Sequence, residues 1–178
     1  MTTARLRALL CTGLALAIGV LALPLTASAN LPKKPACSAV TAKQLKSAFG
    51  YSFSHPTAKA HQTKTMQRLV CTYTSDQGDL SIEYDTLLSN KAARARYAAV
   101  QKALIREANN TPVDIPTQLL PLLPVGGLGD TALRSTDGTV VAFVDGVDCV
   151  TIENGFAEID RRMTRKMVAF AHYVDGHA

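Results

Sequence analysis

The fold of this chain is decided by the stretch RLVCTYTSDQGDLSIEYDT, residues 68–86. Each half of it places an apolar residue at every second position: Leu69, Cys71 and Tyr73, then Leu80, Ile82 and Tyr84. A period of two is typical of a β-strand that packs one face and leaves the other wetter. The residues Asp76-Gln77-Gly78 between the halves are typical of a tight turn. The stretch therefore predicts an antiparallel hairpin.

Three further short strands are predicted downstream, at residues 131–135, 139–144 and 147–153. Asp137-Gly138 and Asp145-Gly146 supply the turns between them. The run Val140–Val144 is apolar on both faces, which predicts a central strand of the sheet.

Three helices complete the pattern. Thr41 and Gln44 form a capping-box signature for the first helix, and Gly50 is a typical stop. The second is predicted from about Asn90 to Asn109, with apolar residues at helical spacing, and the last from Phe156 to Val174. Residues 51–67 are polar without a period and are predicted to be loop. The proline-rich stretch to Gly129 is predicted to be irregular.

Strands followed by helices predict an α+β domain: a single antiparallel sheet of about five strands, with three helices packed on one face. We expect this domain to span residues 37–178. Residues 30–36, with two prolines and two lysines, are predicted to be a short extended linker.

The first 29 residues have the features of a secretory signal peptide. Arg5 and Arg7 precede an apolar run from Leu9 to Leu25, and Ala27-Ser28-Ala29 closes it, so cleavage is expected between Ala29 and Asn30. The run also approaches the roughly 20 residues of a membrane span, so an uncleaved anchor is the alternative. Cys11 lies near the start of the run, which excludes it as a lipidation site. No other segment approaches membrane length, so we expect a soluble chain with no stable membrane insertion after cleavage.

Cleavage leaves 149 of the 178 residues, with 17 basic and 14 acidic side chains and a net charge of +3. That charge is too small to argue for a nucleic-acid partner. The sequence leaves the partner unknown, with a protein and a small-molecule ligand as the two candidates, and no motif calls for a cofactor.

Three cysteines remain after cleavage: Cys37, Cys71 and Cys149. In an oxidising compartment two of them should pair. We expect a bridge from Cys37 to Cys71, which would tie the N-terminal segment to the first strand. By strand parity Cys149 points to the other face of the sheet. It is interpreted either as a small buried hydrophobe or as a free thiol able to react or to form an intermolecular disulfide.

No catalytic signature stands out. His172, Asp175 and His177 are a weak candidate for a metal site, because they lie at a chain end and no second cluster completes the ligand set. Glu83 and Glu153 are a weak candidate for a catalytic carboxylate pair. The glycine cluster at residues 126–129 precedes a strand, so it does not fit a phosphate-binding loop.

The order of these features resembles a known group. A Cys before a capped helix, a second Cys within Leu69-Val70-Cys71-Thr72-Tyr73, and the later Gly-Leu-Gly-Asp-Thr-Ala at residues 127–132 are similar to small secreted and lipoprotein envelope domains of unknown function from actinobacteria. Extracellular sensor domains of receptor kinases from these bacteria are similar in outline. The resemblance implies a non-enzymatic binding module and transfers no functional residues. This chain lacks the lipobox common in the group.

Three functions are therefore considered. The leading hypothesis is a secreted, non-catalytic binding or sensing domain of the bacterial envelope or exterior. One alternative is a small secreted hydrolase that uses Cys149 or a histidine. The other is a secreted inhibitor or protein-interaction module that acts through the loop from Leu119 to Gly129.

The leader gives the first testable prediction. Mass spectrometry of the secreted protein should find Asn30 as the mature N-terminus, because the small residues before it suit signal peptidase. An intact leader on the secreted chain would contradict this prediction.

Overall fold

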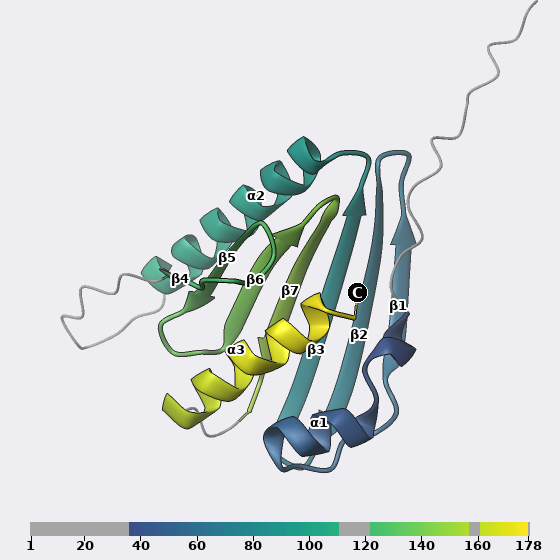
Figure 1. The fold of residues 1–178 in the computed structure, drawn as a ribbon, viewed down its shortest axis with the longest axis vertical. Helices are drawn as coiled ribbons and strands as arrows, with labels where there is room; N and C mark the ends of the chain where they lie inside the picture. Colours follow the sequence, from purple (N-terminus) through teal and green to yellow (C-terminus); the bar gives the residue numbers. More distant parts are fainter. Residues whose placement is uncertain (1–35, 111–121, 157–160, 178) are drawn as a thin grey trace, which may run out of the picture.

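The computed structural model describes residues 36–110, 122–156 and 161–177, in which one antiparallel sheet of seven strands runs beside three α-helices (Figure 1). Across the sheet the strands are β1 (Thr57–Gln62), β2 (Met66–Ser75), β3 (Gly78–Leu87), β7 (Asp148–Asn154), β6 (Val140–Asp145), β5 (Thr131–Ser135) and β4 (Leu122–Pro124). The helices are α1 (Ala42–Phe49), α2 (Asn90–Asn110) and α3 (Arg161–Asp175), and a short 3-10 turn, η1 (Cys37–Ala39), precedes α1. The α+β class is confirmed.

The hairpin predicted from the opening stretch is formed by β2 and β3. Ser75 pairs with Gly78 across a turn made of Asp76 and Gln77. Gly78 has a φ of 131°, and a Cβ at this position would lie 2.3 Å from the carbonyl oxygen of Gly155. The turn therefore needs glycine for its backbone angle and for this close approach.

The sheet has seven strands rather than the expected five, and both extra strands lie at its edges. The prediction of a loop at residues 51–67 is wrong, because β1 forms there and pairs with β2. Every residue of β1 is exposed, so the strand has no apolar alternation to detect. At the other edge β4 is only three residues long and ends at Pro124, which suits an edge position.

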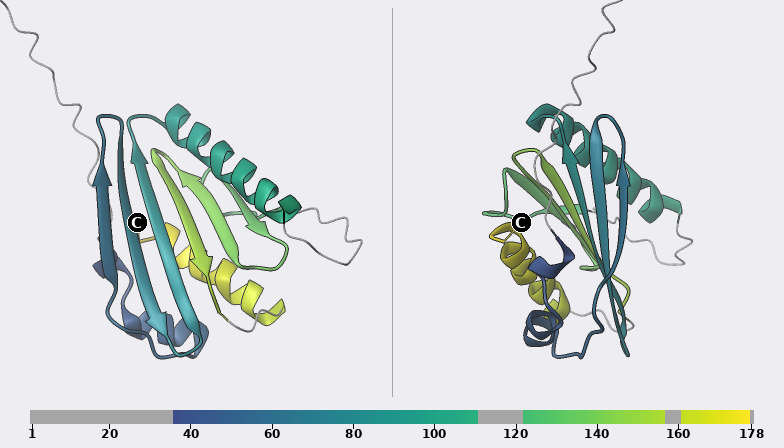
Figure 2. Two further views of the ribbon diagram at one scale, coloured as in Figure 1. Left: turned by 180° about the vertical axis from the view of Figure 1, so that it is seen from behind. Right: turned by 90° about the vertical axis from the view of Figure 1, so that its right-hand side faces the viewer.

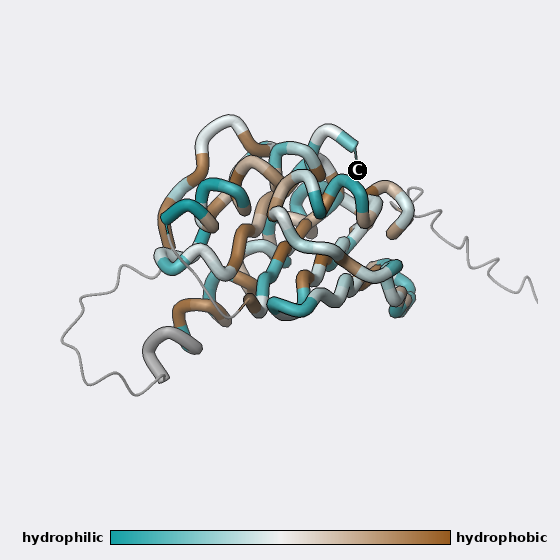
Figure 3. The backbone as a smooth tube through the Cα atoms, turned by 90° about the horizontal axis from the view of Figure 1, so that it is seen from below, coloured by the Kyte–Doolittle hydropathy of each residue, from teal (hydrophilic) through white to brown (hydrophobic). Residues whose placement is uncertain are grey.

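The expectation that all three helices pack on one face is also wrong. One face carries α1 and α3, and α2 lies on the opposite face, as the edge-on view in Figure 2 shows. The physical reason lies in the two central strands β6 and β7, which bury residues on both faces. Phe143 and Val150 face α1 and α3, whereas Val144 and Cys149 face α2. Viewed from below, hydrophobic and hydrophilic stretches alternate along the backbone tube (Figure 3).

Helix α1 begins and ends where the sequence predicts. The backbone N–H of Gln44 donates to the Thr41 hydroxyl at 3.3 Å, and the Thr41 N–H donates to Gln44 Oε1 at 2.7 Å, which completes the capping box. Gly50 ends the helix in the left-handed region, with a φ of 89°. Leu45 and Phe49 are the residues of α1 that enter the core.

Helix α2 is joined to its face of the sheet by a cluster of ion pairs. Asp85 on β3, whose side chain is 2% exposed, accepts hydrogen bonds from Arg68 on β2 and from Arg96 on α2. Arg96 also donates to Glu83 at 2.8 Å. Burial alone would raise the pKa of Asp85, but the hydrogen bonds from the two guanidinium groups outweigh it and hold this pKa below its ordinary value.

Replacing the buried carboxylate should destabilise the fold in a pH-dependent way. We expect Asp85→Asn to lower the free energy of unfolding by roughly 3 kcal/mol at pH 7, at the low end of the range for a broken buried ion pair because both arginines are partly exposed. Because the folded-state pKa of Asp85 is depressed, its stabilisation is present above the unfolded value of about 3.9 and is lost as the pH falls through the folded value. Urea unfolding at several pH values measures both effects.

The matched control is Asp79→Asn, which removes an exposed carboxylate from the same strand. We expect this variant to change stability by no more than about 0.5 kcal/mol at any pH. Equal effects of the two substitutions would show that the ion cluster does not stabilise α2 on the sheet.

Candidate functional site

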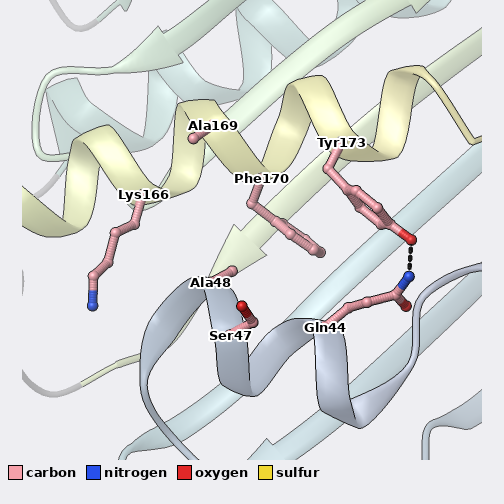
Figure 4. A pocket seen from close by; sticks show the side chains of 7 residues that line it. All are labelled: Gln44, Ser47, Ala48, Lys166, Ala169, Phe170 and Tyr173. Carbon is pink, nitrogen blue, oxygen red and sulfur yellow. Dashed lines mark hydrogen bonds between the residues drawn. The ribbon is translucent and has the colours of Figure 1, made fainter.

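A pocket of about 350 Å³ opens between α1 and α3, on the face of the sheet opposite α2 (Figure 4). Seven residues line it: Gln44, Ser47 and Ala48 from α1, and Lys166, Ala169, Phe170 and Tyr173 from α3. The lining positions recur at three- and four-residue intervals, so each helix presents one stripe to the pocket. The volume lies at the small end of the range found for small-molecule sites.

The floor of the pocket is apolar and closely packed. Phe170 is 3% exposed, and its ring lies edge-to-face against Phe49 with the ring centroids 5.3 Å apart. Phe49 also contacts Phe53 and Phe156 in the same edge-to-face manner. The pocket therefore stands on a packed aromatic cluster.

One end of the pocket is closed by a hydrogen-bond network between the two helices. The side-chain amide of Gln44 donates to the hydroxyl of Tyr173, which is also 3.4 Å from the carbonyl oxygen of Ala39. The other side-chain atom of Gln44, Oε1, is already engaged by Thr41 in the capping box. Gln44 thus both caps α1 and positions Tyr173. Few hydrogen-bonding groups of the Gln44 side chain are therefore left for a ligand.

The other end of the pocket carries a positive charge. Lys166 extends from α3 toward the end of α1, where its Nζ donates to the carbonyl oxygen of Phe49 at 2.8 Å (Figure 4). An ammonium group has three N–H donors, so this bond leaves two for other acceptors. The exposed Ser47 lies between this end and Gln44 on the α1 side. The site combines an apolar floor, a closed polar end and a cationic end.

The sequence alone did not reveal this pocket. Gln44 was recognised only as a capping residue, and Lys166 only as one of several basic residues on the last helix. Their convergence depends on how α1 and α3 pack, since Gln44 and Tyr173 are 129 positions apart in the chain. The stripe of Ser47 and Ala48 on α1 is the one local signal, because small residues there leave space beside α3.

The structure places Cys37 and Cys71 at disulfide distance, with sulfur atoms 1.99 Å and Cα atoms 5.5 Å apart. The bridge lies on the α1 side of the sheet, where Cys71 is fully buried. Nearby, the hydroxyl of the buried Tyr73 donates to the carbonyl oxygens of Cys37 and Val40 at 2.8 and 3.0 Å.

Cys149 lies on the opposite face, buried at 1% exposure among the residues that contact α2. Burial raises the pKa of its thiol to about 12, which opposes the thiolate form that a nucleophile needs. The register from β1 through β2 and β3 to β7 puts His61 three strands from Cys149, about 14 Å away. The structure does not join these two residues into a catalytic pair.

The residues of the weak metal candidate have other contacts. Asp175 accepts from the backbone N–H of Gly129 at 3.1 Å. His177 stacks on Tyr173 with ring centroids 4.1 Å apart, and its Nδ1 lies 2.7 Å from the carbonyl oxygen of the same residue. Within the described ranges, no group of three or more His, Cys, Asp and Glu side chains is arranged to hold a metal ion.

The two residues of the carboxylate candidate lie on adjacent strands, and one of them belongs to an ion cluster. Glu83 pairs in register with Thr151, and Glu153 pairs with Ser81, so the two glutamates are diagonal neighbours on adjacent strands. Glu83 belongs to the ion cluster with Arg68 and Arg96.

Several sequence predictions fall partly or wholly outside the residues that the structure describes. These are the leader with Cys11, the cleavage site between Ala29 and Asn30, positions 30–35 of the predicted linker, positions 119–121 of the proposed interaction loop, and positions 157–160 of the predicted last helix. Within that loop, Leu122–Pro124 form β4, and Gly127 and Gly129 have positive φ angles in the turn that leads to β5. None of the described helices is both long and apolar enough to cross a membrane.

Comparison with known proteins gives no family model, curated protein or solved structure that matches this chain. The pocket and its side chains are therefore the basis for a functional proposal.

The burial of Cys149 gives a prediction that bears on the hydrolase alternative. In the mature protein with the Cys37–Cys71 bond intact, iodoacetamide at pH 8 should leave Cys149 unmodified, because the thiol is both inaccessible and protonated. The same sample in urea should gain one adduct by mass spectrometry, which controls for reagent activity. Rapid modification of the native protein would contradict the buried position and restore the thiol as a candidate nucleophile.

Proposed function

We propose that this protein is a secreted, non-catalytic binding module of the bacterial envelope or exterior, and that it holds a small ligand in the pocket between α1 and α3. The observation that carries the proposal is the pocket itself, with an apolar floor at Phe170 and polar groups at its two ends. Binding sites for small molecules typically have this composition, with a mostly apolar lining and a few polar groups that orient the ligand.

The supporting evidence for secretion is separate from the pocket. The leader sequence suits export, and a pair of cysteines at disulfide distance is compatible with an oxidising compartment. The preference for binding over hydrolysis comes from Cys149, whose burial and raised thiol pKa disfavour nucleophilic chemistry.

A neutral apolar dye tests the proposed pocket. N-phenyl-1-naphthylamine becomes fluorescent in apolar surroundings, and we expect it to bind the mature protein and shift the NMR signals of residues 44–48 and 166–173. Ala169→Phe should weaken this binding at least tenfold, because Ala169 is an exposed residue on the pocket wall and a larger side chain there would fill the space without entering the core.

The matched control is Ala99→Phe, the same substitution at an exposed alanine of α2 on the other face of the sheet. It should bind the dye like the wild type, and thermal unfolding should verify that both variants are folded. Equal affinities of the two variants, or no binding to the wild type, would refute the pocket as the ligand site.

A further inference from the structure

We infer that the pocket selects amphipathic anions: ligands that join a compact apolar body to a single negatively charged group such as a carboxylate. This inference rests on the proposed function, because it assigns the ligand class of the same α1–α3 pocket. Three observations carry it: the polar groups of the pocket that already form hydrogen bonds within the protein, those that are left for a ligand, and the charge of the surrounding residues.

The groups that remain for a ligand are the Ser47 hydroxyl, which can donate or accept, and the Lys166 ammonium, which only donates and carries the one charge of the lining. At the closed end, the side-chain amide N–H of Gln44 donates to the Tyr173 hydroxyl, and the side-chain oxygen Oε1 of Gln44 accepts from Thr41. At the cationic end, the Lys166 ammonium uses one donor on the Phe49 carbonyl oxygen and keeps two. No carboxylate belongs to the seven lining residues, so nothing in the lining neutralises Lys166. An anion would therefore gain a charge-assisted hydrogen bond that a neutral ligand lacks.

The charged residues around the pocket are mostly positive, like Lys166 inside it. The described residues of α1 and α3 include six basic side chains and one carboxylate, Asp175 at the far end of α3; the basic residues are Lys43, Lys46, Arg161, Arg162, Arg165 and Lys166. Lys43 lies one helical turn before Ser47, and Arg162 lies one turn before Lys166, so both follow the stripes that face the pocket. These exposed cations favour the approach of a negatively charged ligand.

The apolar part of the pocket limits the rest of the ligand. Phe170, Ala48 and Ala169 offer carbon surface and small side chains, which suit an aliphatic chain or a ring system. A volume of about 350 Å³ accommodates a molecule of that kind rather than a folded partner. Along the α3 stripe, Ala169 and Phe170 lie between the cationic end at Lys166 and the closed polar end at Tyr173, so the apolar body of the ligand would lie beside its charged group.

The test compares two ligands that share a chain and differ in charge. Decanoate, kept as monomers, and decanol are each titrated against protein loaded with N-phenyl-1-naphthylamine, and dye displacement is read by fluorescence. We expect decanoate to displace the dye at concentrations about tenfold lower than decanol. Lys166→Gln should abolish this preference, and Lys166→Arg should retain it because the positive charge is kept.

Arg165→Gln is the matched control, since it removes a neighbouring exposed cation that does not line the pocket. It should keep most of the preference for decanoate. A cooperative thermal unfolding transition of the Lys166→Gln variant shows that this variant is folded. A parallel titration with phosphatidylglycerol vesicles distinguishes a membrane lipid from a free amphiphile as the source of the anion.

The outcomes separate the two proposals. If the dye binds in the pocket but decanoate and decanol displace it equally, and vesicles do not displace it in a Lys166-dependent way, the ligand class is wrong while the binding site stands. If the dye does not bind at all, the proposed function fails first. Lys166-dependent displacement by decanoate or by vesicles supports the inference.

Discussion

The approach of Cys37 to Cys71 at disulfide distance places the N-terminal segment against the sheet, directly before α1, which lines one side of the pocket. Helix α1 has eight residues, fewer than the roughly 12–15 at which an isolated helix becomes even marginally stable in water. Contacts hold it at both ends: the Cys37–Cys71 pair and the Tyr73 hydroxyl lie before it, and Lys166 donates to its last carbonyl oxygen, that of Phe49. Closing a loop with a sequence separation of 34 contributes about 3–4 kcal/mol in the chain-entropy account.

The two faces of the sheet are stabilised by different interactions. On the α2 face, Asp85 joins β3 to Arg96 through a nearly buried ion pair, next to a smaller apolar cluster that contains Cys149. On the α1 and α3 face, a larger apolar core surrounds the aromatic cluster at Phe49 and Phe170. The charged groups of the ion cluster on the α2 face pair with one another, whereas the pocket has a lysine without a carboxylate partner among the lining residues. This difference is why the proposed ligand site lies between α1 and α3.

The pocket combines residues from the first and last helices of the described chain. Gln44 and Tyr173 meet across it, and Lys166 reaches the end of α1. These contacts also position α1, so the residues that hold the helix in place are the ones that shape the pocket. A ligand bound there would contact both helices and should favour the folded state, since the unfolded chain does not bring the two stripes together.

The sequence by itself determined the elements whose signals are local: the β2–β3 hairpin through its alternation and turn, the limits of α1 through Thr41, Gln44 and Gly50, and the central position of Val140–Val144 through its apolar run. The alternation of side chains along each strand also predicted that Cys149 lies on the face of the sheet opposite Cys71. Only the tertiary structure decided the edge strands, the side on which α2 packs, the Arg96–Asp85 ion pair and the pocket. The physical reason is the sequence separation of the residues that interact. Caps, turns and alternation depend on residues close together in the chain. An exposed edge strand has no apolar pattern, and the pocket forms only where two helices distant in the sequence meet.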